Sequence, residues 1–278
     1  MRLMTGRAID LQGRVALVTG GGGGIGGAAS TALAEAGAHV LVVDIDEGLA
    51  TERVEGILAA GGVATAVIAD VREPDQIVSM QQAAQDLAGP VDILVNNVGH
   101  YERPSAFLES NEGQWQALAD INFVHVLRCS RAFVPGMVER GSGSVVNVAS
   151  VEGIRGYPLD PVYGAYKAAV LHFTRCLALE VAATGVRVNA IAPDVTQSLQ
   201  VDYEAMVPPE LRDRWPYWVP IGRVGEPADC ADVILFLASD LARFVTGHVM
   251  PTDGGTVLGG GWFRTEGRRG WTNRPRNA

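Results

Sequence analysis

The chain has 278 residues, of which 47% are hydrophobic, so it is long enough to bury the core of one large domain or two small ones. Its 31 acidic and 22 basic residues give a formal net charge of −9, which argues against a general binder of nucleic acid or anionic membranes. The sequence contains no apolar run of about 18 residues, the length that indicates a membrane span, and no apolar signal core near the N-terminus.

The three cysteines, Cys129, Cys176 and Cys230, lie far apart, and each falls within an apolar helical pattern. Their spacing matches neither a metal site nor a disulfide framework. We therefore expect three buried, reduced thiols, no metal centre and a cytoplasmic location.

The first recognisable unit begins with an apolar strand at residues 14–19. Seven glycines follow at 20–24, 26 and 27, then a helix at 28–36 and a second apolar strand at 39–43 that ends in Asp44. A strand, a glycine turn, a helix, a strand and an acid within about thirty residues are typical of a dinucleotide-binding unit. The alternative is a flexible glycine linker, which the strand before the glycines and the helix after them disfavour.

Apolar strands and helices continue to alternate along the chain. The patterns predict helices at 47–60, 74–87, 112–139, around residues 163–167, and at 227–237, and strands at 63–69, 91–95, 144–148, 186–191 and 247–250. This order predicts an α/β fold: a single doubly wound Rossmann domain over residues 1–256, with a parallel, seven-stranded sheet and helices on both faces. Residues 194–220 lack periodicity and are expected to form a substrate lid, with a C-terminal extension at 257–278.

Asp44 bears on the choice of nucleotide. An acid at the end of the second strand can accept both ribose hydroxyls of NAD, and it would repel the 2′-phosphate of NADP. The glycine loop has no Arg or Lys to hold such a phosphate. The sequence therefore favours NAD, although Asp44 could instead cap the next helix, a role that Asp46 could also fill.

Lys167 is the only lysine in the sequence, and it lies four residues after Tyr163. On a helix the two side chains share one face. An ammonium beside a phenol can lower the pKa of the tyrosine and make it a general acid or base. The alternative is a surface tyrosine and a surface lysine on a polar helix face.

Several motifs together resemble the short-chain dehydrogenase/reductase family over roughly residues 11–256. Thr19-Gly20-x-x-x-Gly24-Ile25-Gly26 is similar to its cofactor loop, and Asn96-Asn97-Val98-Gly99 resembles its N-N-A-G motif. Tyr163-x-x-x-Lys167 resembles its catalytic pair. Ser150 and Asn122 occupy the positions of the family's serine and of the asparagine in its central helix.

The resemblance implies hydride transfer between a nicotinamide and a secondary alcohol or ketone. It implies that Tyr163 is the general acid or base, that Ser150 holds the substrate oxygen, and that Lys167 binds the nicotinamide ribose and lowers the pKa of Tyr163. Asn122 would anchor a water in the proton relay. The implied cofactor-binding residues are Gly20, Gly24, Ile25, Gly26, Asp44, Ile45, Asp70, Val71, Asn97, Val98, Gly99, Tyr163, Lys167, Pro193, Val195 and Thr196.

Simpler roles remain open for some of these residues. Ser150 could be a turn cap, and Asn122 could cap the backbone inside a helix kink. The histidines His100, His125 and His172 are expected to be packing or surface residues.

The chain departs from the family after its sixth strand, where the family usually has Pro-Gly. Here Pro193 is followed by Asp194, which adopts left-handed angles less readily than glycine and adds a carboxylate near the cofactor. This departure puts the carboxamide contacts in question, as does Ser198, which stands where the family often has a threonine.

The lid and the extension are rich in large side chains. We expect residues 197–220 to select a bulky, apolar or ring-containing alcohol, or alternatively to pack a subunit interface. The extension, with five arginines and Trp262, Phe263 and Trp271, is interpreted as an arm that crosses to a neighbour in a homotetramer, or alternatively as a disordered tail. The lid residues in question are Leu199, Tyr203, Met206, Trp215, Tyr217 and Trp218.

Two other functions compete with an NAD-dependent dehydrogenase. One is an NADPH-dependent 3-oxoacyl-acyl-carrier-protein reductase, against which Asp44 and the aromatic lid count. The other is a non-catalytic, NAD-binding regulatory protein, which the complete set of candidate catalytic residues disfavours.

Overall fold

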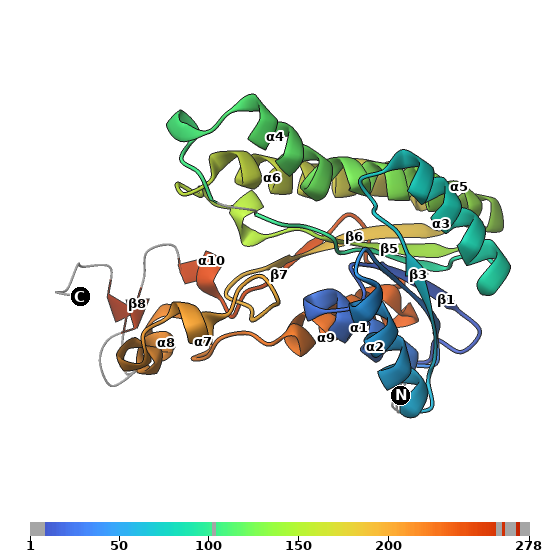
Figure 1. Ribbon diagram of the computed structural model, residues 1–278, viewed down its shortest axis with the longest axis horizontal. Helices are drawn as coiled ribbons and strands as arrows, with labels where there is room; N and C mark the ends of the chain where they lie inside the picture. The colour runs from blue at the N-terminus through green and yellow to red at the C-terminus, as the bar shows by residue number, and fades with distance from the viewer. Residues whose placement is uncertain (1–8, 102–103, 260–262, 265–270, 273–278) are drawn as a thin grey trace, which may run out of the picture.

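The structure is a computed structural model that describes residues 9–101, 104–259, 263–264 and 271–272. Seven parallel strands form one sheet in the order β3-β2-β1-β4-β5-β6-β7, as expected for a doubly wound fold (Figure 1). The strands are β1 (Val15–Thr19), β2 (His39–Asp44), β3 (Val63–Ile68), β4 (Ile93–Asn96), β5 (Gly143–Val148), β6 (Val186–Pro193) and β7 (Val249–Thr252).

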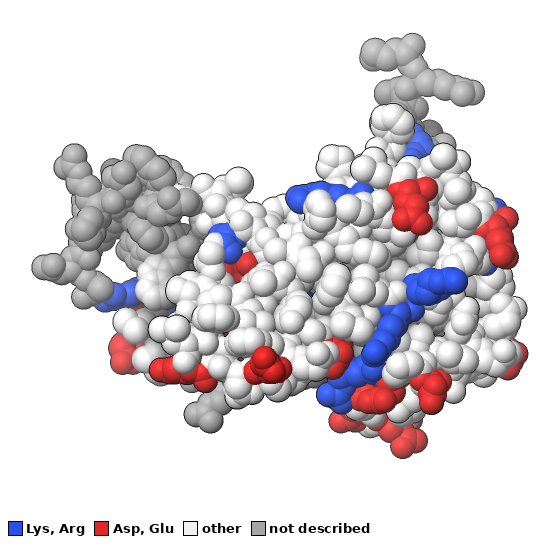
Figure 2. Space-filling model, turned by 90° about the horizontal axis from the view of Figure 1, so that it is seen from above, with Lys and Arg blue, Asp and Glu red and all other residues white. Residues whose placement is uncertain are grey.

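Helices cover both faces of the sheet (Figure 1). One face carries α1 (Gly24–Glu35), α2 (Glu47–Ala59) and α9 (Pro227–Ala238). The other carries α3 (Pro74–Leu87), α4 (Glu112–Ala119), α5 (His125–Arg140) and α6 (Pro161–Val181). Figure 2 views the molecule from the side of α4, α5 and α6 and shows few charged side chains in the middle of this face.

The core lies in two layers, one on each face of the sheet. Leu33 of α1 and Ile234 of α9 are fully buried on one side, and Met137 of α5 is fully buried on the other. The strands between them are apolar at nearly every position, because a parallel sheet covered on both faces leaves no side for polar residues. Fully burying one such large apolar side chain contributes about 1.5–3 kcal/mol.

The long helix expected at 112–139 is interrupted. A π-helical turn, Asp120–Val124, separates α4 from α5. The amide of Asn122 donates to the Leu118 carbonyl at 3.1 Å, taking the acceptor that the backbone of a regular helix would use. The sequence pattern does not reveal this interruption because both halves keep a helical apolar period.

Two further expectations need correction. Cys176 is exposed on α6, so only Cys129 and Cys230 are buried thiols. The last strand of the sheet runs over Val249–Thr252, two residues later than the apolar pattern predicts. None of the helices described here is long and apolar enough to cross a membrane.

The segment expected to be a lid contains short helices: α7 (Tyr203–Met206), a 3₁₀ turn (Pro209–Arg214) and α8 (Trp215–Trp218). After β7 the chain continues into α10 (Thr256–Gly259) and a two-stranded antiparallel pair, β8 (Phe263–Arg264) and β9 (Trp271–Thr272). Strand β8 lies against α8. Trp262 and the other residues of the proposed arm at 260–262, 265–270 and 273–278 lie outside the described residues.

Candidate active site

A cavity of about 580 Å³ opens at the carboxyl ends of β1, β4, β5 and β6. This is the edge at which open α/β sheets bind ligands. Among the predicted site residues, Gly26, Asp70, Val71 and Asn122 do not line the cavity. Those that do are Gly20, Gly24, Ile25, Asp44, Ile45, Asn97, Val98, Gly99, Ser150, Tyr163, Lys167, Pro193, Val195 and Thr196.

The glycine loop has the geometry of a phosphate cradle. Gly20 and Gly24 have positive φ angles of 61° and 53°, which glycine adopts most readily. A Cβ at Gly26 would collide with the carbonyl oxygen of Gly20. Gly23 caps α1 without a side-chain hydrogen bond, so the N–H groups of the first turn remain available to an anion. These features fit a bound pyrophosphate.

Asp44 lies where an adenosine ribose is expected. Its Oδ2 accepts from the Gly22 N–H at 3.0 Å, and its Oδ1 accepts from the Asp46 N–H at 3.1 Å. The cap of α2 is Asp46, whose carboxylate accepts from the Leu49 N–H at 3.0 Å. The alternative role of Asp44 as a helix cap is therefore not observed, and its carboxylate faces the cavity.

Arg53 is a cation near the glycine loop that the sequence patterns did not identify. Arg53 of α2 donates from Nε to the Gly22 carbonyl at 3.2 Å and from Nη1 to Thr31 Oγ1 at 3.2 Å. The guanidinium thus joins α2 to α1 behind the loop, and Arg53 is not among the residues that line the cavity. Only its place on the helix after Asp44 hinted that it could reach the loop.

Thr19 and Asn97 hold the ends of β1 and β4 together. The Asn97 amide donates to the carbonyls of Thr19 and Gly20 at 3.0 and 3.2 Å. Thr19 Oγ1 accepts from the N–H groups of Asn97 and Val98 at 3.0 and 3.3 Å. Thr19 is fully buried and fixes the loop that carries Val98 and Gly99.

Asp70 does not offer its carboxylate to the cavity. Arg72 donates to both carboxylate oxygens through Nε and Nη2 at 2.7–3.0 Å. These hydrogen bonds hold the pKa of Asp70 below its ordinary value. The expectation that Asp70 and Val71 lie along the adenine is therefore not supported by the cavity lining, because Asp70 is paired and Val71 is buried.

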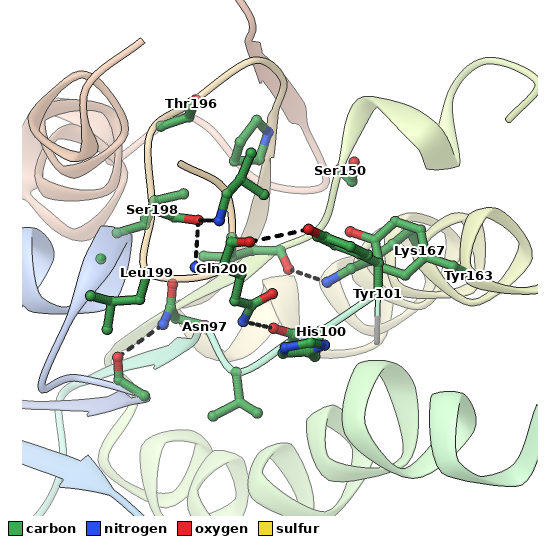
Figure 3. Close-up of a pocket in the computed structure, with 18 of the residues that line it drawn as sticks. Asn97, His100, Tyr101, Ser150, Tyr163, Lys167, Thr196, Ser198, Leu199 and Gln200 are labelled. Carbon is green, nitrogen blue, oxygen red and sulfur yellow. Dashed lines mark hydrogen bonds between the residues drawn. The ribbon is translucent and has the colours of Figure 1, made fainter. Parts of the chain in front are cut away.

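Tyr163 and Ser150 meet at the substrate end of the cavity (Figure 3). Burial raises the pKa of Tyr163 above its ordinary range, and a hydrogen bond with Ser150 acts in the opposite direction. Ser150 Oγ also accepts from the Glu152 N–H at 3.2 Å, so it is both a turn cap and a cavity residue. The expected lowering of the Tyr163 pKa is not found, because burial outweighs every opposing contribution.

Lys167 is buried beside the tyrosine. Its Nζ lies 5.6 Å from the centre of the Tyr163 ring and donates to the Val148 carbonyl at 3.3 Å. Burial lowers the pKa of Lys167 to about 8. A Cβ at Gly99 would lie 2.7 Å from this Nζ and 3.2 Å from Asn122 Oδ1, so only glycine leaves room between the two groups.

Asn122 is fully buried and braces the chain after β4. Its Oδ1 accepts from the His100 N–H at 3.1 Å, and its Nδ2 donates to the His100 carbonyl at 2.7 Å. The alternative role, capping the backbone at a helix kink, is therefore observed. Anchoring a relay water remains a prediction.

Asp194 does not stand free, although it replaces the expected glycine. Its Oδ2 accepts from Thr256 Oγ1 at 2.5 Å and lies 3.0 Å from Arg155 Nη2. Its Oδ1 accepts from the N–H of Val195, which takes the left-handed φ of 37°. The side chain of Asp194 thus stabilises the turn into Thr196, whose hydroxyl donates to the Asp194 carbonyl at 2.8 Å.

Residues 198–201, part of the segment expected to form the lid, close over the cavity, held by hydrogen bonds that the sequence does not reveal. Gln200 Nε2 donates to the Gly99 carbonyl at 2.8 Å, and Tyr101 Oη donates to the Gln200 carbonyl at 3.1 Å (Figure 3). Ser198 Oγ accepts from the N–H groups of Gln200 and Val201. The side chain of Leu199 lies directly over Gly23 of the glycine loop.

The large lid side chains divide into two groups. Leu199, Tyr203 and Met206 line the cavity, as a substrate lid requires. Trp215 packs edge-on against Tyr203 with ring centres 5.4 Å apart and lies behind the cavity wall. Trp215 and Trp218 form the second group. Because Trp218 is 63% exposed, the alternative that these residues pack a subunit interface stays open.

No group of metal-ligating side chains occurs within the described ranges. The site instead combines a glycine loop at a helix N-terminus, a carboxylate in the cavity wall and a buried tyrosine–lysine pair. A family model described as enoyl-(acyl carrier protein) reductase matches residues 20–257, most of the chain. The chain belongs to the short-chain dehydrogenase/reductase family. It is accordingly an oxidoreductase of a family that binds a nicotinamide cofactor.

Known members of the family share most of their length with this chain. The 3-oxoacyl-[acyl-carrier-protein] reductase FabG of Thermotoga maritima is 36% identical and aligns over 89% of this chain and 99% of its own. The cis-4-hydroxycyclohexanecarboxylate dehydrogenase of Sinomonas cyclohexanicum is 37% identical, over 87% and 96%. The crystal structure of gox2181 is 36% identical with a TM-score of 0.84, over 90% of this chain and 97% of that one.

Proposed function

We propose that this short-chain dehydrogenase/reductase transfers hydride between NAD(H) and a secondary alcohol or ketone that is bulky or cyclic. The observation that carries the proposal is the meeting of Ser150, Tyr163 and Lys167 with Asp44 in one cavity. Chain segments more than one hundred residues apart in sequence converge there, at the sheet edge where ligands bind.

The roles of the side chains follow from their positions. A bound nicotinamide accepts or supplies the hydride. In the direction of reduction, Tyr163, which burial keeps protonated, donates its proton to the substrate oxygen while Ser150 donates a hydrogen bond to that oxygen as negative charge develops on it. Oxidation is the reverse, in which the Tyr163 phenolate takes the proton of the substrate hydroxyl. Lys167 lies beside Tyr163 to hold the nicotinamide ribose and to stabilise the phenolate. Asn122 fixes the backbone of His100 and is proposed to anchor a relay water.

Asp44 supports NAD as the cofactor. Its carboxylate faces the cavity from the end of β2, where it can accept the ribose hydroxyls and would repel a 2′-phosphate. The guanidinium of Arg53 also lies near the glycine loop, but it already donates to the Gly22 carbonyl and to Thr31 Oγ1. Neither Asp44 nor Arg53 therefore favours a 2′-phosphate at this end of the cavity.

The substrate end of the cavity supports a large ring or chain. Its wall includes Tyr101, Tyr157 and Tyr203 together with Leu159 and Met206. Such a wall buries apolar surface, and a similar enzyme from Sinomonas cyclohexanicum is named for a cyclohexane substrate.

A 3-oxoacyl-acyl-carrier-protein reductase is the second candidate, because the similar Thermotoga maritima enzyme carries that name. Asp44 argues against the NADPH that we associate with this alternative. A non-catalytic regulatory protein is the third candidate, and the assembled Ser150, Tyr163 and Lys167 argue against it.

Absorbance of the reduced nicotinamide tests the proposal. The purified enzyme is mixed with NAD or NADP and with secondary alcohols that range from short chains to fused rings. We expect turnover with NAD and a large alcohol, and its loss in Tyr163→Phe, which keeps the ring but removes the proton-transferring hydroxyl. NAD binding by calorimetry without turnover of any alcohol or ketone would contradict the proposal.

A substitution at Asp44 tests the choice of cofactor. Because hydrogen bonds to a charged group contribute about 1.5–3 kcal/mol, Asp44→Ser should reduce kcat/KM for NAD by roughly tenfold or more and should narrow the preference over NADP. Asp46→Ser is the matched control, since it alters only a helix cap. A wild-type preference for NADP would show this interpretation of Asp44 to be wrong.

A further inference from the structure

Two carboxylates lie in the cavity wall next to the catalytic serine. Glu152 follows Ser150 by two residues, and Asp194 comes directly after β6; both line the cavity. Their side chains are only 14% and 10% exposed. Carboxylates with so little access to water need charged or hydrogen-bonding partners. The partners of Glu152 and Asp194 therefore determine the net charge of the substrate pocket.

Arg155 is the partner of both acids. Its Nη2 lies 2.8 Å from Glu152 Oε1 and 3.0 Å from Asp194 Oδ2. Arg155 does not itself line the cavity. One guanidinium balances one carboxylate, so the cluster of Glu152, Asp194 and Arg155 retains one negative charge, and both acids face the pocket.

Two other charged residues, Asp44 and Lys167, occur in the described lining. Asp44 stands at the ribose end of the cavity and is also negative. Lys167 is bound to the Val148 carbonyl beside Tyr163, in the position proposed for the nicotinamide ribose. No arginine occurs among the described lining residues. Among the described lining residues, an anionic substrate group beside Glu152 and Asp194 would meet negative charge, and the only Lys or Arg, Lys167, lies beside Tyr163.

Aromatic rings surround the same space. The rings of Tyr101 and Tyr157 stand edge-on to Tyr163, with centres 6.4 and 6.2 Å away, and Tyr203 also lines the cavity. Ring faces attract cations, most strongly where water is excluded. After burial, the charges of Glu152 and Asp160 raise the pKa of Tyr157, and the charges of Asp194 and Glu152 contribute to raising the pKa of Tyr203, so both rings lie in a negative field.

We propose that Glu152, supported by Asp194 and the tyrosine rings, selects substrates by charge, and that the preferred substrates are secondary alcohols that carry an ammonium group. This inference rests on the proposed alcohol dehydrogenase activity and specifies its substrate class. Carboxylated alcohols and acyl-carrier-protein thioesters with an acidic carrier are disfavoured by the same charges.

A matched series of ring alcohols tests the proposal. Cyclohexanol is the neutral reference, and the 2-, 3- and 4-substituted aminocyclohexanols and hydroxycyclohexanecarboxylates place a positive or a negative group on the same ring. With NAD, we expect kcat/KM for the best ammonium isomer to exceed that of cyclohexanol by roughly tenfold, and every carboxylate to fall below it. Equal or better turnover of a carboxylate would overturn the proposal.

Two variants should change the charge preference in opposite directions. Glu152→Gln removes the unbalanced charge and should reduce the ammonium-to-neutral ratio of kcat/KM by about tenfold. Arg155→Met removes the guanidinium that pairs with Glu152 and Asp194, so it should raise the ammonium-to-neutral ratio of kcat/KM. A simple loss of folding would lower all rates and leave the ratio unchanged. Asp232→Asn, on the exposed side of α9, is the control that should not alter the ratio.

The outcomes separate this inference from the proposed function. If cyclohexanol is oxidised and the ammonium isomers are not favoured, the enzyme is an alcohol dehydrogenase and the charge inference is wrong. If none of the alcohols is oxidised although NAD binds, the proposed function itself fails. If the ratio is the same in Glu152→Gln as in the wild type, Glu152 does not determine specificity.

Discussion

His125 is the most completely enclosed ionisable ring in the described part of the chain. It begins α5, is fully buried, and packs close enough to Lys167 for the lysine charge to act on it. Burial, and then the charge of Lys167, lower the pKa of His125 to about 3. The expectation that this histidine packs in the interior is confirmed, and the folded protein holds the ring neutral.

This neutral ring should make the protein sensitive to acid. Below the ordinary histidine pKa of 6.5, the unfolded chain binds a proton that the folded chain refuses, so stability falls as the pH drops from 6.5 towards about 3. Each pH unit costs about 1.4 kcal/mol. Lys167 adds nothing to this slope, because its lowered pKa of about 8 leaves it protonated in both states.

His125→Phe should remove this part of the acid sensitivity. We expect the free energy of unfolding in urea to fall between about pH 7.5 and about pH 5 by roughly 2 kcal/mol more in the wild type than in the variant. His172→Phe, on the exposed side of α6, is the control that should keep the wild-type slope. Parallel curves for the wild type and His125→Phe would contradict the prediction.

At the scale of residues, the sequence identified the groups whose chemistry is fixed by type and spacing. Tyr163 and Lys167 were found because a helix places residues four apart on one face, and Ser150 was found through the resemblance to the family. Gln200 and Arg155 were missed because they act through partners distant in sequence. No local spacing shows that Gln200 donates to Gly99 or that Arg155 joins Asp194 to Glu152.

At the scale of elements, the junction between the glycine loop and α1 leaves little room for side chains. Gly26 has no room for a side chain because the Gly20 carbonyl occupies that position. Gly56, in contrast, lies inside α2 with no atom within 4 Å of the place where a Cβ would be. The two glycines therefore serve different purposes, one steric and one unexplained by contacts.

Alanine substitutions should separate these purposes. Gly26→Ala should lower stability by about 1–3 kcal/mol and weaken NAD binding, because backbone atoms must move to accept the methyl group. Gly56→Ala should raise stability by about 0.5–1 kcal/mol, because alanine restricts the unfolded chain and the site is open. Thermal unfolding and calorimetric titration with NAD would measure both effects. Equal effects of the two substitutions would contradict the steric argument.

The elements themselves were predicted well where apolar periodicity is strong. The order of strands and helices was predicted from alternating patterns, and β2 was placed within one residue. The π-turn at Asp120–Val124 was anticipated only as an alternative role for Asn122, because the side-chain hydrogen bond of Asn122 leaves the apolar pattern intact. The lid was expected over residues 194–220, but the hydrogen bonds that close residues 198–201 over the cavity could not be predicted, because that segment has no regular period.

At the scale of the whole molecule, large apolar side chains remain exposed at one end of α6. Leu179 is 85% exposed, and Phe244 is fully exposed. They flank the place where the backbone of Gly247 approaches Ala178. Exposed apolar side chains of this size are typical of contact surfaces between subunits, which agrees with the expected homotetramer.

Solution mass tests this assembly. We expect light scattering to give four times the chain mass of 29.4 kDa. Phe244→Asp should yield a smaller, folded species, because the new charge would be buried in the contact. Leu58→Asp, which alters a half-exposed leucine on α2, is the matched control. A monomeric wild type would contradict the proposal, and unchanged mass and kinetics after deletion of residues 260–278 would exclude the proposed arm.

The order of the strands also has a consequence for folding. Strand β4 pairs with β1 across an intervening stretch of chain that includes β2 and β3, so Leu17 lies beside Leu94. Contacts between distant parts of a chain form late, because the loop that joins them must first close. The cradle on β1 and the tyrosine after β5 come together only when this central pair exists. Binding of the nicotinamide cofactor would therefore report that folding is complete. Partly folded chains lack the assembled site and would not bind the cofactor.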